Sequence, residues 1–207
     1  MDHFAVVGLP RTYELDVMDL ERRYKEMSKK LHPDRFARAD ARARRASLSR
    51  SVALNEAWRT LRDPVRRGEY LLLLSGIEVG GEEGTKRLGP QEKSGKSGKS
   101  GKSERLPVPQ ELLMEVMELR ETLAEARMSN DQPAIDALAA DVADRRARAL
   151  STVSEGFAAQ PAHLARVAAA LVEVRYFDRF LQEVAAHGEA QAEAAGGTSR
   201  PEVSHGG

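Results

Sequence analysis

The stretch from Lys29 to Phe36 constrains the fold most, because a basic helical run ends there at a proline. Pro33 disfavours the helical backbone conformation for His32, the residue before it, so a helix that arrives through Leu31 is expected to stop there. His32 and Asp34 would then lie at an exposed loop tip beside a cluster of positive charge. This pattern favours a docking surface over a catalytic site, although an ordinary solvated turn between two helices would share it.

The residues before this loop predict an amphipathic helix with one apolar side and one cationic side. Asp16 is placed to cap its first turn. An apolar stripe follows at spacings of 4, 3 and 4, formed by Leu20, Tyr24, Met27 and Leu31. Five basic residues lie away from the stripe: Arg22, Lys25 and Lys29 opposite it, and Arg23 and Lys30 at its flanks.

The residues after the loop predict a second helix, from about Asp40 to Leu61, that packs against the first as an antiparallel hairpin. Its apolar set is Leu48, Val52, Leu54, Trp58 and Leu61. Asp63-Pro64 ends this helix, and a short helix from Val65 to Leu74 follows. We therefore expect residues 1–78 to form a helical domain that holds His32-Pro33-Asp34 at the tip of its hairpin.

Residues 79–107 predict a flexible linker. Lys-Ser-Gly occurs three times in succession from Lys93, and few apolar residues are present to form a core. The Gly-Lys-Ser triplets resemble part of a phosphate-binding loop. That motif needs a glycine five residues before the Gly, where this chain has Pro90, Lys93 and Lys96. We therefore expect no nucleotide site in the segment.

Residues 108–187 predict three more helices, which would form a three-helix bundle. The first follows Pro107-Val108-Pro109, the second opens at Pro133, and the third runs from Pro161 to Gly188. The predicted fold class is thus all-α, with two helical domains joined by a linker. Gly, Ala, Glu and Ser dominate residues 188–207, which we expect to be a disordered tail.

The first helix of this bundle has more apolar residues than one buried face requires. A stripe at spacings of 4, 3, 4 and 3 suffices for the core: Leu112, Val116, Leu119, Leu123 and Ala126. The adjoining face carries three surplus apolar residues followed by three glutamates: Leu113, Met114, Met117, Glu118, Glu121 and Glu125. This face is a candidate recognition surface, because methionine adapts to a partner's shape. Alternatively, Leu113 and Met114 widen the core contact.

The charge distribution also separates the two ends of the chain. Residues 1–80 carry 16 basic and 12 acidic side chains, whereas residues 106–207 carry 9 and 16. Two surfaces for two partners would explain this difference, and so would ordinary variation between exposed faces. The chain has no cysteine, no apolar run long enough to span a bilayer and no recognisable signal peptide at Met1-Asp2-His3-Phe4, so we expect a cytoplasmic protein.

The first domain resembles a J domain, the module that docks on DnaK-type chaperones and stimulates their ATP hydrolysis. The resemblance rests on His32-Pro33-Asp34, the basic face before it, and the segment from Leu54 to Pro64. The opening from Asp2 to Pro10 and the ending from Arg67 to Leu72 resemble the HscB family, co-chaperones of iron–sulfur cluster assembly. The resemblance implies a chaperone-binding set: His32, Pro33, Asp34, Arg22, Arg23, Lys25, Lys29 and Lys30.

The segment from Leu112 to Leu123 resembles the helix by which HscB proteins bind an IscU-type iron–sulfur scaffold. Val116 and Met117 differ from the residues expected there but stay apolar. The resemblance implies a scaffold-binding set: Leu113, Met114, Met117, Glu118, Glu121, Glu125 and, from the third helix of the bundle, Tyr176. Tyr176 would alternatively flank the core beside Val174.

The resemblance therefore implies a co-chaperone that is not an enzyme, has no catalytic residue, metal or cofactor, and serves an HscA-like chaperone and an IscU-type scaffold. The alternative is a J-domain co-chaperone with another client. A metal-dependent hydrolase is disfavoured, because none of the histidines pairs at a spacing of three or four: His3, His32, His163, His187 and His205. A nucleic-acid binder could use Arg42, Arg44, Arg45 and Arg50, but no aromatic platform or recognition motif supports it.

Overall fold

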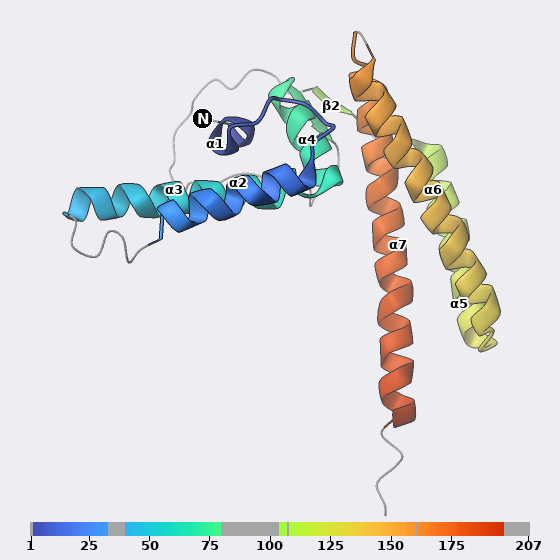
Figure 1. Ribbon diagram of the computed structural model, residues 1–207. Helices are drawn as coiled ribbons and strands as arrows, with labels where there is room; N and C mark the ends of the chain where they lie inside the picture. Colours follow the sequence, from blue (N-terminus) through green and yellow to red (C-terminus); the bar gives the residue numbers. More distant parts are fainter. Residues whose placement is uncertain (1, 33–39, 80–103, 107, 160, 197–207) are drawn as a thin grey trace, which may run out of the picture. The chain divides into compact units, whose positions relative to one another are not determined.

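The computed structural model describes residues 2–32, 40–79, 104–106, 108–159 and 161–196 (Figure 1). Contacts group the chain into two compact units. Unit 1 comprises Met1–Val108 and Leu150–Val172, and unit 2 comprises Pro109–Ala149 and Glu173–Gly207. Residues 150–172 were predicted to belong to the second domain, whereas their contacts group them with the first. The described part is mainly helical, in agreement with the predicted all-α class.

Helix α1 (His3–Val7) is short, and local hydrogen bonds set both of its ends. The side chain of Asp2 accepts a hydrogen bond from the backbone N–H of Ala5 at 2.7 Å. Gly8 ends the helix with a φ of 68°, a left-handed conformation that costs glycine little. The helix buries Phe4 and Val7.

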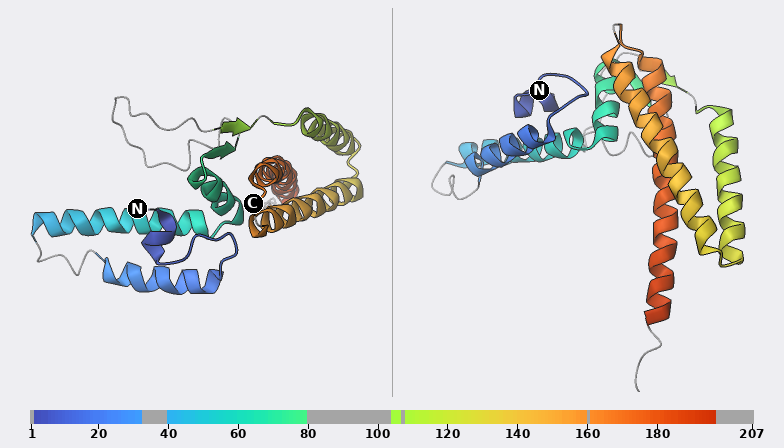
Figure 2. Two further views of the ribbon diagram at one scale, coloured as in Figure 1. Left: turned by 90° about the horizontal axis from the view of Figure 1, so that it is seen from above. Right: turned by 45° about the vertical axis from the view of Figure 1, so that its right-hand side comes forward.

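Helices α2 (Val17–Lys30) and α3 (Ala41–Leu61) form the predicted hairpin, and they lie side by side in Figures 1 and 2. Each begins at an aspartate whose side chain accepts hydrogen bonds from backbone N–H groups of the first turn. Asp16 does so for α2 and Asp40 for α3. Both starting points agree with the prediction to within one residue.

The outward side of α3 differs from the prediction. Leu48 and Val52, which the sequence analysis counted in the apolar set, are 65% and 50% exposed. Ser47 and Ser51 take the inward positions, and their hydroxyls donate to the backbone carbonyl of Leu31 at 3.1 and 3.4 Å. The next residue along a helix points about 100° away, which turns Leu48 and Val52 toward solvent.

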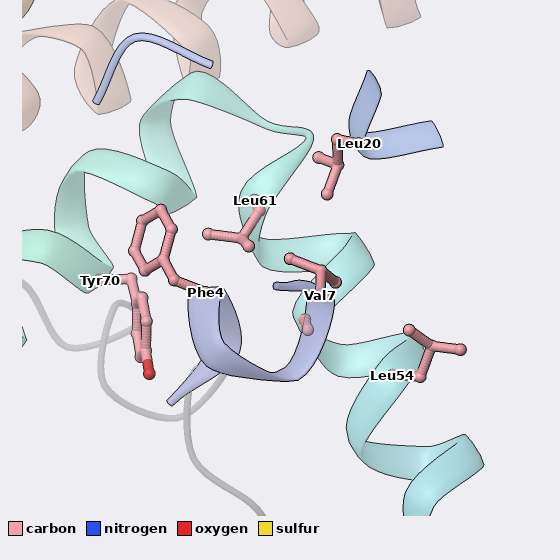
Figure 3. Close-up of a cluster of buried hydrophobic side chains, with 7 residues drawn as sticks. Phe4, Val7, Leu20, Leu54, Leu61 and Tyr70 are labelled. Atoms are coloured by element: carbon pink, nitrogen blue, oxygen red, sulfur yellow. The ribbon is translucent and has the colours of Figure 1, made fainter. Parts of the chain in front are cut away.

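Helix α4 (Pro64–Leu74) completes the core of the first domain. Asp63 caps it, and Pro64 stands at its first position, where a missing N–H leaves no bond unmade. Figure 3 shows the core cluster, whose members come from α1, α2, α3 and α4: Phe4, Val7, Leu20, Leu54, Ala57, Leu61 and Tyr70. Burying a side chain such as Phe4 or Leu61 contributes roughly 1.5–3 kcal/mol, so this cluster holds the hairpin to both short helices.

Two short strands that the sequence analysis did not predict follow α4. Strand β1 (Ile77–Val79) pairs in parallel with β2 (Glu104–Leu106). The register places Ile77 opposite Glu104 and Val79 opposite Leu106. β2 lies inside residues 79–107, which were predicted to be a flexible linker. Regular secondary structure therefore resumes before the predicted end of that linker. Residues 80–103, which contain the Lys-Ser-Gly repeats, lie outside the described residues.

Within unit 1, residues 150–172 pack against the first domain. The rings of Tyr13 and Phe157 stack with their centroids 5.1 Å apart. A Cβ atom at Gly68 would lie 3.1 Å from Cδ1 of Leu171, which is closer than most side chains allow. Glycine at position 68 therefore permits α4 to approach Leu171 closely.

Unit 2 contains α5 (Gln110–Met128) with parts of α6 (Gln132–Ala158) and α7 (Leu164–Gly196). Figures 1 and 2 show α6 beside both α5 and α7. The predicted core stripe of α5 is buried throughout: Leu112, Val116, Leu119, Leu123 and Ala126. Ion pairs connect all three helices: Glu115 with Arg145, Arg146 with Asp178, and Arg127 with Glu183.

Helix α7 continues past its predicted end. This helix was predicted to end at Gly188, before a disordered tail over residues 188–207, but α7 extends to Gly196. The reason is that one glycine costs a helix only about 1 kcal/mol, and residues 189–196 are rich in alanine and glutamate, which favour helix. Residues 197–207 lie outside the described residues.

Candidate partner-binding surfaces

Helix α2 ends close to the position expected from the sequence. α2 ends at Lys30, and Leu31 caps it through backbone hydrogen bonds to Met27 and Ser28. His32 follows and is exposed. Pro33 and Asp34 lie outside the described residues, so their predicted role in docking stays a prediction.

Three of the five predicted cations on α2 are already paired along the helix. Lys25 lies 2.6 Å from Glu21, and Arg22 contacts both Asp19 and Glu26. Hydrogen bonds from Arg23 and then from Arg22 hold the pKa of Asp19 below its usual value. Exposed pairs at these spacings contribute little to stability, so a partner could replace them at little cost.

Arg23 differs from the other cations because it also holds the backbone. Its guanidinium donates to the carbonyl oxygen of Gly8 at 2.9 Å and to Asp19 at 2.7 Å. These bonds connect α2 to the residue that ends α1. The structure therefore gives Arg23 a role within the fold, beside its predicted role in docking.

Lys29 and Lys30 are the cations nearest the loop. Both are exposed, and neither forms an ion pair with any residue in the part of the chain that the structure describes. Unpaired positive charge at an exposed end of a helix attracts acidic groups and speeds their encounter. Of the five predicted cations, these two are therefore the most accessible to acidic groups of a partner.

The surplus apolar residues of α5 lie on its surface. Leu113, Met114 and Met117 are 40%, 57% and 63% exposed. Glu118, Glu121 and Glu125 are exposed on the same helix. The alternative that Leu113 and Met114 widen the core is thus disfavoured, and α5 presents an apolar and acidic face to solvent. Its role in binding stays a prediction.

Ion pairs with the other helices anchor α5 beneath this face. Glu115 contacts Arg145 of α6, and the guanidinium of Arg127 donates to the backbone carbonyl of Glu183 of α7 at 2.9 Å. Burial, and next the charge of Glu115, raise the pKa of Glu173 of α7. The face therefore stands on a helix that both neighbours hold in place.

Tyr176 lies on α7 and is partly buried, whereas Val174 and Phe177 beside it are fully buried. This intermediate exposure fits either of the two interpretations of Tyr176. Its assignment to the scaffold-binding set remains a prediction.

A small hollow between α2 and α3 was not predicted from the sequence. Its lining consists of Tyr24, Asn55, Trp58, Arg59 and Arg62. Asn55 and Arg59 of α3 and its C-cap residue Arg62 recur at spacings of four and three, which was the available signal. Trp58 was instead assigned to the apolar set of α3, so the polar residues around it were not recognised as the lining of a hollow.

Among the described residues, no group of three or more histidine and acidic side chains could hold a metal ion. None of the described helices combines the length and the apolar content that a membrane-spanning segment requires.

The hairpin fold and its cationic helix define a J-domain protein, and the DnaJ domain model matches residues 2–70. A second model, described as the HSCB C-terminal oligomerisation domain, matches residues 108–185. A co-chaperone protein HscB homolog of Paraburkholderia phymatum is 36% identical over 142 residues, which cover 69% of each chain. The chain therefore belongs to the HscB family of J-domain co-chaperones.

Two solved structures share the fold. The chaperone HscB from Vibrio cholerae matches with a TM-score of 0.73 and 26% identity, over 92% of this chain and 99% of that one. The human co-chaperone protein HscB matches with a TM-score of 0.71 and 24% identity, over 90% of this chain and 82% of that one. The second likeness concerns the fold alone.

Proposed function

We propose that this co-chaperone binds a DnaK-type, HscA-like chaperone through its J domain and stimulates the chaperone's ATPase. It delivers an IscU-type iron–sulfur scaffold, which the exposed face of α5 holds. Membership of the HscB family supports both partners, which the resemblance implied. The observation that carries the proposal is the combination, in one chain, of a J domain and an anchored helix that exposes Leu113, Met114 and Met117 above three glutamates.

The mechanism is tethering followed by stimulation. Holding the scaffold and the chaperone on one chain raises the effective concentration of one beside the other. Contacts from Lys29, Lys30 and the loop that contains Asp34 would then favour the chaperone's hydrolysis-competent state. In this proposal the chain breaks no bond itself, the ATP belongs to the partner, and the site of action is the cytoplasm.

The decisive experiment measures ATP turnover by an HscA-like chaperone with the parent protein and with Asp34→Asn, each with and without the scaffold. The parent should stimulate turnover, and the scaffold should increase the stimulation. We expect Asp34→Asn to lose at least about tenfold in stimulation, equivalent to roughly 1.4 kcal/mol of lost coupling. Scaffold binding, measured by calorimetry, should stay unchanged in the variant, because α5 is untouched. A variant as stimulatory as the parent would contradict the proposed role of the loop.

A further inference from the structure

Helix α3 exposes a continuous stripe that the J-domain core leaves free. Six exposed residues recur at spacings of 3, 4, 3, 4 and 3: Arg45, Leu48, Val52, Asn55, Arg59 and Arg62. Residues at these spacings lie on one face of a helix. The end of the stripe nearest α4 coincides with the hollow between α2 and α3.

The hollow has an aromatic wall and a cationic rim. The rings of Tyr24 and Trp58 stack with centroids 4.8 Å apart, and the Tyr24 hydroxyl donates to Oδ1 of Asn55 at 2.9 Å. The guanidinium carbon of Arg62 lies 5.8 Å from the centre of the Trp58 ring. Stacking and this cation–π contact fix the wall and hold one of the two arginines over it.

The charge on this rim is not neutralised within the described part of the chain. Neither Arg59 nor Arg62 forms an ion pair with a described residue, and both are exposed. Two unpaired guanidinium groups, Arg59 in the last turn of α3 and Arg62 at its C-cap, suit a carboxylate, because each can donate two parallel N–H bonds to it. The cavity volume is about 290 Å³, at the lower limit for small-molecule sites, so it fits one side chain better than a cofactor.

The hollow includes a residue of α2, the helix already assigned to chaperone binding. Tyr24 belongs to α2, the helix that also carries the predicted chaperone-binding cations, although Lys25 points about 100° away from Tyr24 around the helix. A stacked nucleic-acid base is a poorer occupant, because the ring of Trp58 already contacts Tyr24 and Arg62. Charge complementarity, together with the part that α2 has in both surfaces, therefore favours an acidic group of the chaperone.

We propose that the hollow formed by Tyr24, Asn55, Trp58, Arg59 and Arg62 receives an aspartate or glutamate side chain of the DnaK-type chaperone. This inference rests on the proposed function and extends the docking surface from α2 onto α3. The two arginines bind the carboxylate, and the aromatic wall excludes water from one side of it. The hollow contributes affinity, whereas the loop that contains His32 stimulates hydrolysis.

The test compares Arg59→Gln/Arg62→Gln with the parent in binding to the ATP-bound chaperone, at low and at moderate salt. We expect Kd to rise about tenfold at low salt and less at moderate salt, because exposed charges are screened. Stimulation at saturating co-chaperone should stay at the parent level. The control is Arg44→Gln/Arg66→Gln, which removes the same charge from exposed positions outside the hollow and should change Kd less than about threefold.

The possible results separate a failure of the hollow from a failure of the proposed function. Parent protein that stimulates the chaperone, together with a hollow variant that binds as tightly as the control, overturns the hollow and leaves the proposed function standing. Parent protein that neither binds nor stimulates the chaperone overturns both. If the hollow variant loses a self-association that light scattering detects in the parent, the occupant of the hollow is a second copy of this chain. If it loses a salt-resistant gel shift that the parent shows, the occupant is a nucleic acid. Either result would overturn the inference.

Discussion

Arg23 and Lys30 belong to the same predicted docking set, but the structure gives them different surroundings. Arg23 donates to the carbonyl of Gly8 and to Asp19, so its loss would leave a backbone acceptor at the end of α1 without its partner. Lys30 is exposed and forms no ion pair with a described residue. Chemical type and sequence position alone could not separate the two roles.

This difference predicts a split between stability and docking. Arg23→Gln should lower the free energy of unfolding by about 0.5–1.5 kcal/mol, the usual worth of such a hydrogen bond, whereas Lys30→Gln should change it by less than about 0.5 kcal/mol. Urea denaturation measures both changes in the free energy of unfolding.

In chaperone binding, Lys30→Gln should raise Kd about two- to fivefold at low salt, and Lys30→Arg should restore the parent Kd. Equal destabilisation by both glutamine variants would show that the assignment is wrong.

His3 predicts a dependence of stability on pH. Its ring lies 4.3 Å from the ring of Tyr70, and burial lowers its pKa in spite of the opposing effects of Glu56 and then Asp2. The unfolded chain therefore binds a proton at His3 at a higher pH than the folded chain does. Stability from this group is fully present above the unfolded pKa of 6.5 and is lost as pH falls toward the lower folded pKa.

Thermal melting of the parent and of His3→Gln at pH 7.5 and pH 5.5 tests this dependence. The parent should lose more stability between the two values than the variant, because glutamine does not titrate. The other histidines contribute equally to both proteins, so the difference isolates His3. A variant with the same loss as the parent would rule out a titrating role for His3.

At the scale of elements, α5 separates its two sides cleanly. Its core stripe is at most 8% exposed, whereas Met117 is 63% exposed and Glu118 and Glu121 are exposed beside it. Exposed apolar side chains next to acidic side chains suit a partner that has an apolar patch and a basic rim. Since α6 and α7 anchor α5 from below, changes on its exposed side should affect binding and leave the fold intact.

Charge reversal on α5 tests this expectation. Glu118→Lys/Glu121→Lys should weaken binding of the IscU-type scaffold at least about tenfold in calorimetry, because attraction becomes repulsion at two positions. The midpoint of thermal unfolding should move by less than about 2 °C, since surface substitutions seldom change stability strongly.

The matched control is Asp136→Lys/Asp144→Lys, which makes the same change in net charge on exposed positions of α6 and should bind normally. Intact scaffold capture by the α5 variant would favour a J-domain protein with another client.

Local signals predicted the helices well, and longer-range features escaped them. Asp16, Asp40 and Asp63 cap helices within one residue of the predicted starts, because a cap depends on neighbours in the chain. The close approach of Gly68 to Leu171 depends on residues a hundred positions apart, and no local pattern reports it. The hollow likewise escaped prediction, because it requires Tyr24 of α2 and Arg59 of α3 together.

At the scale of the whole molecule, the two candidate surfaces belong to different compact units. The cations of α2 lie in unit 1, and the acidic face of α5 lies in unit 2. This separation agrees with the excess of basic residues in 1–80 and of acidic residues in 106–207. In the proposed function, the basic surface would bind the chaperone and the acidic face would bind the scaffold, and holding both on one chain would raise their effective concentration.

The pairing of β1 with β2 has a consequence for chain length. Val79 and Glu104 occupy neighbouring strands of one small sheet, so both ends of the intervening segment are held within roughly 10 Å of each other. Doubling the length of such a segment costs only about 0.6 kcal/mol in closure entropy. Residues 80–103 are therefore where this chain can gain or lose residues during evolution, or accept a fluorescent label, with little disturbance to the helices on either side.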